Sequence, residues 1–219
     1  MKFSLDLDGV VADYGDGLRR VAARLNIAPQ SQPVGLEPME LDALMRERQQ
    51  AARAEVSRWI VDNVEEFYGG LASLVQAGDI RAINVALAEG HELFWVSNRG
   101  FGYSADGGTF ASLCADTTFR WLQAHDLPVD DRHLVLTYDK AASITENGIK
   151  CHLDDVVPHV TQIALETGAQ VYLLRRPWNQ RIILQGEDQG EYRTTAAAFG
   201  VPEVGSIAEY VALATGRQM

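Results

Sequence analysis

The sequence predicts an α/β fold in which a parallel sheet is covered by helices on both of its faces. Two observations predict it. From residue 80 onward, short and nearly continuous apolar segments alternate with segments of helical periodicity, which is typical of strands buried on both faces. Residues 14–79 show helical periodicity and no strand-like alternation. We therefore expect an α/β core formed by residues 1–13 and 80–219, with a small helical segment, residues 14–79, inserted after the first strand.

The first expected strand is the apolar run near the N-terminus, which ends in two carboxylates, Asp6 and Asp8, followed by Gly9. Alternate side chains of a strand share a face, so the two carboxylates can share one cation or one phosphate group. Gly9 allows the backbone to turn at this point because it has no Cβ atom. An Asp-x-Asp sequence alone is also typical of a solvated strand end, so its meaning depends on the partners that the rest of the chain supplies.

The inserted segment is expected to be helical on both sides of a loop. Apolar residues recur at helical spacing over residues 18–25 and again over residues 41–67, where Gly69 and Gly70 end the pattern. Residues 28–38 are rich in Pro, Gln, Ser and Gly, which indicates the loop.

The core is expected to contain further strands at residues 92–96, 133–137, 149–153 and 170–174, and helices at residues 80–87, 110–122 and 160–165. A C-terminal helix is expected to begin after Ser206, because Ser206 and Glu209 have the spacing of a capping box.

Each expected strand is followed by polar or charged side chains, namely Asp6 and Asp8, Ser97, Lys140, Asp154 with Asp155, and Arg175. In parallel sheets, ligands bind beyond the carboxyl ends of the strands. We therefore expect these side chains to form one site.

The composition limits the class of partner. Nineteen Lys and Arg against thirty Asp and Glu give a formal charge of −11, which argues against a surface that coats a nucleic acid polymer. No segment approaches the roughly 18 apolar residues of a membrane span, and the acids at positions 6 and 8 interrupt what would be the apolar part of a signal peptide. The two Cys residues form no dense disulfide framework, which favours a reducing compartment. We expect a soluble cytoplasmic protein whose oligomeric state is open, a homodimer included.

The expected site suits phosphoryl transfer through a covalent intermediate. An Asp carboxylate can attack phosphorus and form an aspartyl phosphate that water then hydrolyses. Mg²⁺ is the expected cofactor, because it binds carboxylate, phosphate and water oxygens and offsets the repulsion between the nucleophile and the substrate. Lys140 would neutralise the remaining charge, and Ser97 would hold the phosphoryl oxygens.

The same residues carry a resemblance to a known superfamily. Asp6-Leu7-Asp8-Gly9-Val10, then Ser97, Lys140 and Asp154-Asp155, resemble motifs one to four of the haloacid dehalogenase (HAD) superfamily of aspartate-nucleophile phosphatases. The resemblance implies a Rossmann-like HAD core with a small helical cap. It also implies that Asp6 is the nucleophile and Asp8 the general acid and base. Mg²⁺ would be bound by Asp6, the main-chain carbonyl of Asp8 and one of Asp154 or Asp155.

Within that superfamily, the chain is similar to the 5′(3′)-deoxyribonucleotidases. The similar segments are residues 8–13, the helical insertion, residues 66–71 and residues 136–140. The family's second motif commonly reads Thr-Ser-Pro, whereas this chain has Val96-Ser97-Asn98-Arg99, which leaves the substrate preference near this loop open. The resemblance implies a Mg²⁺-dependent phosphatase acting on nucleoside 5′- or 3′-monophosphates, deoxy ones in particular. A HAD phosphatase or phosphomutase for another small phosphorylated metabolite is an alternative, and a non-catalytic nucleotide-binding protein is a second one.

The remaining candidates for substrate binding each have a structural alternative. Asn98 and Arg99 follow Ser97 and are candidates for phosphate contact, although exposed arginines need no special explanation. Phe67 and Tyr68 are candidates for stacking on a nucleobase, but ordinary packing is favoured for any single aromatic residue. The five His residues lack the spacing of a helical metal pair, which argues against a zinc site. His152 is expected to be a core residue.

Overall fold

The computed structural model describes residues 1–27, 50–99, 107–179 and 199–217. Its centre is a six-stranded sheet with strand order β3-β2-β1-β4-β5-β6, in which all paired strands are parallel. The strands are β1 (Lys2–Leu5), β2 (Glu92–Ser97), β3 (Leu134–Leu136), β4 (Cys151–Asp154), β5 (Gln170–Leu174) and β6 (Glu203–Val204). The predicted α/β class is confirmed. Strand β6 was not expected, because a two-residue strand leaves too short a pattern in the sequence.

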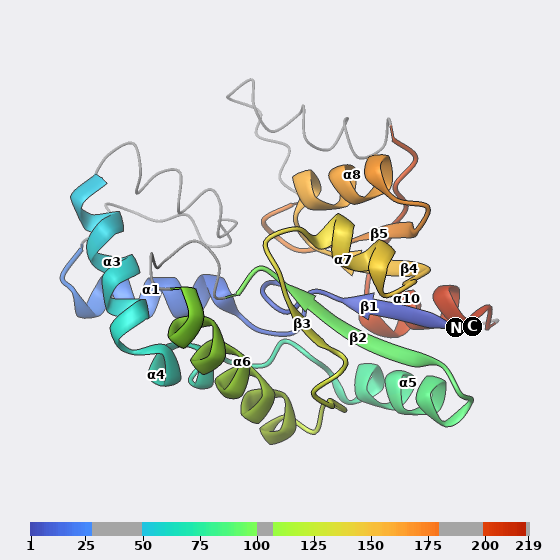
Figure 1. Cartoon of the computed structure of the whole chain (residues 1–219), viewed down its shortest axis with the longest axis horizontal. Coiled ribbons are helices and arrows are strands. Elements are labelled where there is room, and N and C mark those ends of the chain that lie inside the picture. Colours follow the sequence, from blue (N-terminus) through green and yellow to red (C-terminus); the bar gives the residue numbers. More distant parts are fainter. Residues whose placement is uncertain (28–49, 100–106, 180–198, 218–219) are drawn as a thin grey trace.

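The helices described by the structure are α1 (Tyr14–Arg24), α3 (Gln50–Asp62), α4 (Val64–Gly69), α5 (Ala77–Ala88), α6 (Gly107–Ala124), α7 (Lys140–Glu146), α8 (Val157–Glu166) and α10 (Ile207–Thr215). Figure 1 shows α7 and α8 on one side of the strands and α5 on the other. No helix in the described ranges has both the length and the apolar character that a membrane crossing requires.

The two faces of the sheet bury separate apolar clusters. Along β2, Trp95 belongs to the cluster that contains Ile83 of α5, whereas its neighbour Phe94 belongs to the cluster that contains Ile144 of α7 and Val160 of α8. Adjacent side chains of a strand point to opposite faces. Strands covered on both faces favour apolar residues at successive positions, which explains the nearly continuous apolar runs in the sequence.

The inserted segment is helical where it is described. The expected loop at 28–38 and the start of the expected helix at 41–67 lie outside the described residues. The rest of that helix is divided into α3 and α4 at Asn63, whose backbone leaves the helical region and whose side-chain amide donates to the Trp59 carbonyl oxygen at 2.8 Å. Asn competes with the helix through such local hydrogen bonds. Helix α4 packs against α6 of the core, and Figure 1 shows α1, α3 and α4 grouped beyond one side of the sheet.

Two helix starts in the core depend on side-chain caps. The Ser206 hydroxyl accepts a hydrogen bond from the Glu209 main-chain N–H at 3.0 Å, and α10 ends at Gly216 with φ +72°. This agrees with the expected C-terminal helix. Helix α7 was not expected, and it begins where the Asp139 carboxylate accepts from the Ala142 N–H at 2.9 Å. This cap places Lys140 in the first turn of a helix.

Candidate active site

The carboxyl ends of the central strands bring the predicted residues to one edge of the sheet. Asp6 directly follows β1, Ser97 is the last residue of β2, and Asp154 is the last residue of β4. Leu5 of β1 pairs with Trp95 of β2 and with Leu153 of β4, so the three strands end at nearly the same level. Lys140 reaches the same edge from the start of α7.

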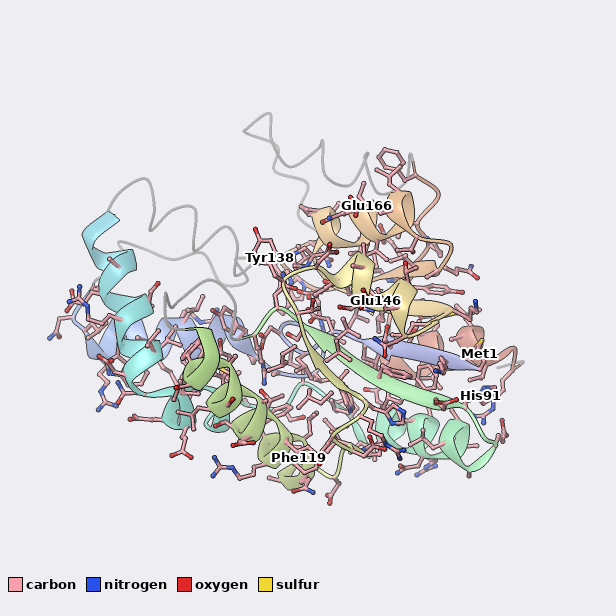
Figure 2. All side chains as sticks on the ribbon, viewed as in Figure 1. Met1, His91, Phe119, Tyr138, Glu146 and Glu166 are labelled. Atoms are coloured by element: carbon pink, nitrogen blue, oxygen red, sulfur yellow. The ribbon has the colours of Figure 1, made fainter. Side chains whose placement is uncertain are left out.

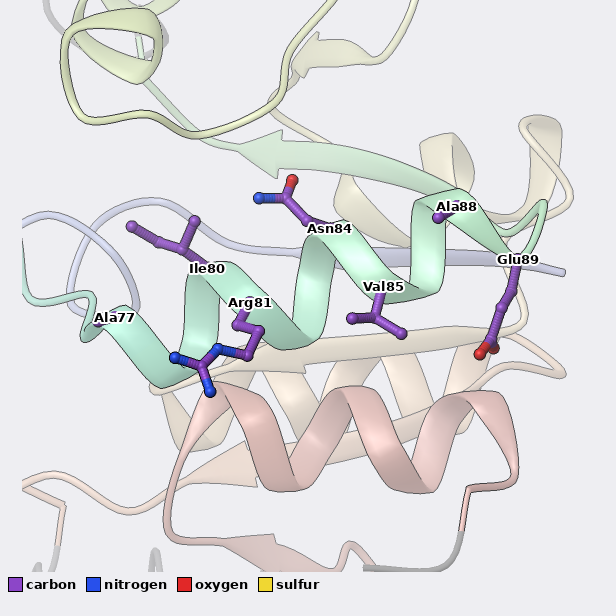
Figure 3. Close-up of a pocket in the computed structure, with 7 residues that line it drawn as sticks. All are labelled: Ala77, Ile80, Arg81, Asn84, Val85, Ala88 and Glu89. Atoms are coloured by element: carbon purple, nitrogen blue, oxygen red, sulfur yellow. The ribbon is translucent and has the colours of Figure 1, made fainter.

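Figure 2 helps to locate this edge. Tyr138 lies between β3 and α7 and is 79% exposed, whereas Met1 and His91 precede β1 and β2 at the opposite edge. A groove of about 650 Å³ on α5, lined by residues that include Ile80 and Val85, is shown in Figure 3. It contains none of the side chains that follow the strands, so it is separate from this site.

The ammonium group of Lys140 lies between two buried carboxylates. Its Nζ atom is 2.7 Å from Asp154 Oδ2 and 3.0 Å from Asp6 Oδ1. Burial lowers the pKa of Lys140, but the two carboxylates outweigh this effect and raise it overall. Burial opposes the ionised form of Asp154, yet Lys140 and the nearby His159 hold the pKa of Asp154 well below its usual range. Lys140 and Asp154 are therefore a charged pair in the interior.

Asp6 has a different electrostatic balance. Burial raises the pKa of Asp6 to about 6, and Lys140 only partly opposes this shift. The negative charges of Asp154 and Asp8 act in the same direction as burial. A cation bound beside Asp6 would favour its ionised form.

Three buried carboxylates have the arrangement of a metal site. Oxygen atoms of Asp6, Asp154 and Asp155 lie within 4.8 Å of one another, and the three residues are at most 4% exposed. Carboxylate oxygens suit Mg²⁺. Asp154 is already engaged, because its Oδ1 accepts from the Val156 N–H at 2.9 Å and its Oδ2 accepts from Lys140. The donor set of Asp6, Asp154 and Asp155 fits a Mg²⁺ ion.

Gly9 allows the first loop to lie against Asp155. Its φ angle is +82°, and a Cβ atom built on it would lie 2.1 Å from Asp155 Oδ2. Only glycine fits this combination of backbone angle and close approach without strain. The role of this glycine in turning the backbone thus extends to making room for a carboxylate of the site.

The turn after β5 holds Asp155 and Gly9 in place. Trp178 Nε1 donates to Asp155 Oδ2 at 2.7 Å, and Asn179 Nδ2 donates to the Asp155 main-chain carbonyl at 2.9 Å. Arg176 Nε donates to the Gly9 carbonyl at 2.8 Å. Trp178 and Arg176 thus link the turn after β5 to Asp155 and to the first loop.

Asp8 is paired with a buried arginine. Arg99 Nε is 3.0 Å from each Asp8 carboxylate oxygen, and Arg99 Nη2 is 2.6 Å from Asp8 Oδ1. Arg99 Nη1 donates to Thr118 Oγ1 at 3.2 Å. Arg99 was predicted to contact phosphate, but all three of its nitrogen atoms have partners within the protein.

Ser97 and Asn98 present polar atoms that the described protein does not satisfy. Ser97 is 1% exposed, and its Oγ has no hydrogen-bond partner among the described residues; the buried Oδ1 of Asn98 has none there either. Buried polar atoms are nearly always hydrogen-bonded. Their position at the end of β2 is consistent with a ligand that supplies the missing partners.

Phe67 and Tyr68 lie in the core rather than on an open face. They are 3% and 1% exposed, and their rings contact each other edge to face at 4.9 Å between centroids. Phe67 also contacts Tyr14, and the Tyr68 ring lies 4.9 Å from the Arg99 guanidinium carbon. The structure favours the packing alternative for both residues.

Two histidines near Asp154 were not recognised as neighbours of the site. His152 Nε2 and His159 Nδ1 lie 3.5 and 3.4 Å from Asp154 Oδ2. His152 Nδ1 is also 2.7 Å from the Ser4 hydroxyl, and burial lowers the pKa of His152. The sequence did contain a signal for His152, since residues two apart on a strand share a face.

Comparison with known proteins identifies the fold. No family model matches the sequence, and no curated protein is significantly similar to it. A haloacid dehalogenase-like hydrolase from Streptococcus pneumoniae is 13% identical with a TM-score of 0.59, over 97% of each chain. A HAD family hydrolase from Deinococcus radiodurans R1, solved with bound phosphate and sodium, is 15% identical with a TM-score of 0.56, over 97% of this chain and 95% of that one. A hydrolase from Pseudomonas syringae is 14% identical with a TM-score of 0.54, over 94% of each chain.

At these identities the likeness establishes the fold, which is that of the HAD hydrolases along nearly the whole chain. The Rossmann-like HAD core expected from the four motifs is thereby confirmed.

Proposed function

We propose that this protein is a Mg²⁺-dependent phosphomonoesterase that hydrolyses nucleoside monophosphates, deoxynucleotides in particular, through a phosphorylated Asp6. The observation that carries the proposal is the position of Asp6. Its carboxylate contacts the ammonium group of Lys140 and belongs to the donor set that it forms with Asp154 and Asp155, at the carboxyl edge of the sheet. A carboxylate that contacts a fixed cation and belongs to a metal donor set suits attack on a phosphate ester.

Each residue has a distinct role in the proposed reaction. An Asp6 oxygen forms a bond to phosphorus while the ester P–O bond breaks, and Asp8 gives a proton to the departing oxygen. Water then attacks the same phosphorus, Asp8 takes its proton, and the bond to Asp6 breaks to release phosphate. Lys140 offsets the negative charge, and the Ser97 hydroxyl donates to a phosphoryl oxygen.

The metal donors follow from the contacts of the two adjacent acids. Asp154 holds Lys140, so we assign Asp155, Asp6 and the Asp8 main-chain carbonyl as the protein ligands of Mg²⁺. A bound Mg²⁺ ion would offset the repulsion between the Asp6 carboxylate and a dianionic phosphate.

Several features support the substrate class. The HAD family hydrolase of Deinococcus radiodurans binds phosphate in its solved structure, and Ser97 and Asn98 offer unsatisfied polar atoms for such a group. The nucleoside part rests on the sequence resemblance to deoxyribonucleotidases and on the exposed aromatic ring of Tyr138 near Lys140. We also assign residues 14–79 as the small cap of the enzyme.

Phosphate release from a substrate panel tests the proposal. The panel contains deoxynucleoside and ribonucleoside 5′- and 3′-monophosphates and sugar phosphates, each with Mg²⁺ and with a chelator. We expect the deoxynucleotides to be the best substrates and the chelator to abolish release. Preferred release from sugar phosphates would instead favour the metabolite phosphatase, transfer of phosphate with little net release would indicate a phosphomutase, and tight nucleotide binding without turnover would indicate a silent binding protein.

Trp178→Phe should weaken Mg²⁺ binding about 10-fold, because it removes the N–H group that orients Asp155. Phe keeps an aromatic ring but is smaller than indole, and the Trp59→Phe control accounts for this loss of size. Mg²⁺ binding is measured by calorimetry, which requires no turnover, and Trp59→Phe in α3 is the matched control. Equal Mg²⁺ affinities of the two variants would show that the Trp178 hydrogen bond does not orient a metal ligand.

A further inference from the structure

The pair formed by Arg99 and Asp8 combines a fully buried cation with a partly exposed carboxylate. The Arg99 side chain has 0% exposure and that of Asp8 has 21%. A buried charge is costly unless it is paired and hydrogen-bonded. Arg99 donates hydrogen bonds from Nε and Nη2 to Asp8 and from Nη1 to Thr118. The guanidinium group is thus committed to Asp8, and its planar shape fixes the direction of that carboxylate.

The two oxygen atoms of Asp8 are not equivalent. Oδ1 is contacted by both Nε and Nη2 of Arg99, whereas Oδ2 is contacted by Nε alone. A carboxylate oxygen can accept more than one hydrogen bond. Oδ2 therefore keeps more capacity for another proton or partner, and the Asp8 side chain as a whole is 21% exposed.

Arg99 itself is contacted by aromatic rings of two helices. The Tyr68 ring of α4 and the Trp121 ring of α6 lie 4.9 and 5.8 Å from its guanidinium carbon. Trp121 Nε1 donates to the Leu71 carbonyl at 2.8 Å, which ties the α6 ring to the chain that follows α4. The packing of α4 and α6 therefore fixes the position of the Arg99 guanidinium group, and Arg99 in turn fixes the orientation of the Asp8 carboxylate.

We propose that Arg99 is a positioning residue for the proton-transfer step, which holds Asp8 with Oδ2 directed at the oxygen atom that leaves phosphorus, and that it does not contact the phosphate group. The inference rests on the proposed function, in which Asp8 supplies that proton. In the step, the ester P–O bond breaks while the proton moves from Asp8 to the leaving oxygen, and Arg99 stays paired with the resulting carboxylate.

The choice of leaving group separates this role from a structural one. An alkoxide, such as the 5′-oxygen of a nucleoside, is a poor leaving group and requires a proton, whereas p-nitrophenolate departs as a stable anion. Misplacing Asp8 therefore slows the alkyl ester selectively. The ratio of the two kcat/KM values, measured on one preparation, does not depend on what fraction of the protein is folded.

The experiment measures this ratio, deoxynucleoside 5′-monophosphate over p-nitrophenyl phosphate, for the wild type, Arg99→Met, Arg99→Lys, Asp8→Asn and the double variant Asp8→Asn/Arg99→Met. We expect the ratio to fall about 10- to 100-fold in Arg99→Met, part of the usual contribution of acid–base catalysis. The ratio should fall less in Arg99→Lys, because Lys keeps the positive charge but lacks the planar group that donates two hydrogen bonds to the carboxylate. In the Asp8→Asn background, Arg99→Met should change the ratio no further.

A wild-type ratio in both Arg99 variants, together with a lowered ratio in Asp8→Asn, would overturn this inference and leave the proposed function standing. An equal rise in KM for both substrates at an unchanged ratio would show that Arg99 binds phosphate, which also overturns it. An unchanged ratio in Asp8→Asn would remove Asp8 as the proton donor and overturn this inference together with the role assigned to Asp8, whereas the phosphatase activity itself is tested separately by the substrate panel.

Discussion

Asp6→Asn should lower phosphate release from every substrate of the panel by at least about 10³-fold, a loss of about 4 kcal/mol of transition-state stabilisation. The amide has the shape of the carboxylate but cannot form a bond to phosphorus. The loss should appear in kcat for p-nitrophenyl phosphate as well as for nucleotides, because the first bond to phosphorus is needed for both. Single-turnover measurements with excess enzyme would show that the chemical step is the one affected.

The same substitution should not destabilise the fold. Burial raises the pKa of Asp6 to about 6, so above that pH the folded protein without metal carries the cost of an ionised buried carboxylate, and this cost disappears as the pH falls below 6. Asn removes the cost at pH 8 and can still accept a hydrogen bond from Lys140. We expect the Tm of Asp6→Asn at pH 8, with chelator present, to equal or exceed that of the wild type.

Asp131→Asn is the control for charge, because Asp131 is exposed and lies before β3. It should keep wild-type release. Wild-type turnover in Asp6→Asn would exclude Asp6 as the nucleophile, and a large fall in its Tm would indicate that lost activity reflects unfolding.

The strand ends could be predicted from the sequence because they depend on the burial of residues that are neighbours in the sequence. The run before Asp6 is apolar since β1 is buried on both faces, and the two acids mark where it leaves the sheet. The same reasoning located Ser97 and Asp154. Helix α7 was missed because its first residue, Lys140, was read as the exit of the preceding strand, and residues 141–146 were assigned to no element.

The contacts between distant segments could not be predicted. Arg99 and Asp8 are separated by 91 positions, and Trp178 and Asp155 by 23. A charge pattern does not show which arginine becomes buried against which acid. For this reason Arg99 was a candidate for phosphate contact, whereas the structure shows it paired with Asp8.

Lys140→Met should destabilise the metal-free protein by about 3–5 kcal/mol, because it leaves Asp6 and Asp154 as buried carboxylates without their shared cation. For a domain of this size, about 2–4 °C of Tm corresponds to each kcal/mol, so Tm should fall by about 6–20 °C. Unfolding is followed by calorimetry with chelator present. Lys150→Met is the matched control, since Lys150 is exposed and its removal should change Tm little.

The destabilisation should depend on pH with a definite sign. In the wild type, Lys140 helps to hold the pKa of Asp154 well below its usual range, so this pair stabilises the fold above the unfolded pKa and loses its effect in acid. Without Lys140, the pKa of Asp154 rises, and the folded variant binds more protons than the unfolded chain. The Tm deficit of Lys140→Met should therefore be larger at pH 8 than at pH 5, and adding Asp154→Asn should recover part of it. A deficit that is equal at both pH values would show that the loss comes from packing rather than from unpaired charge.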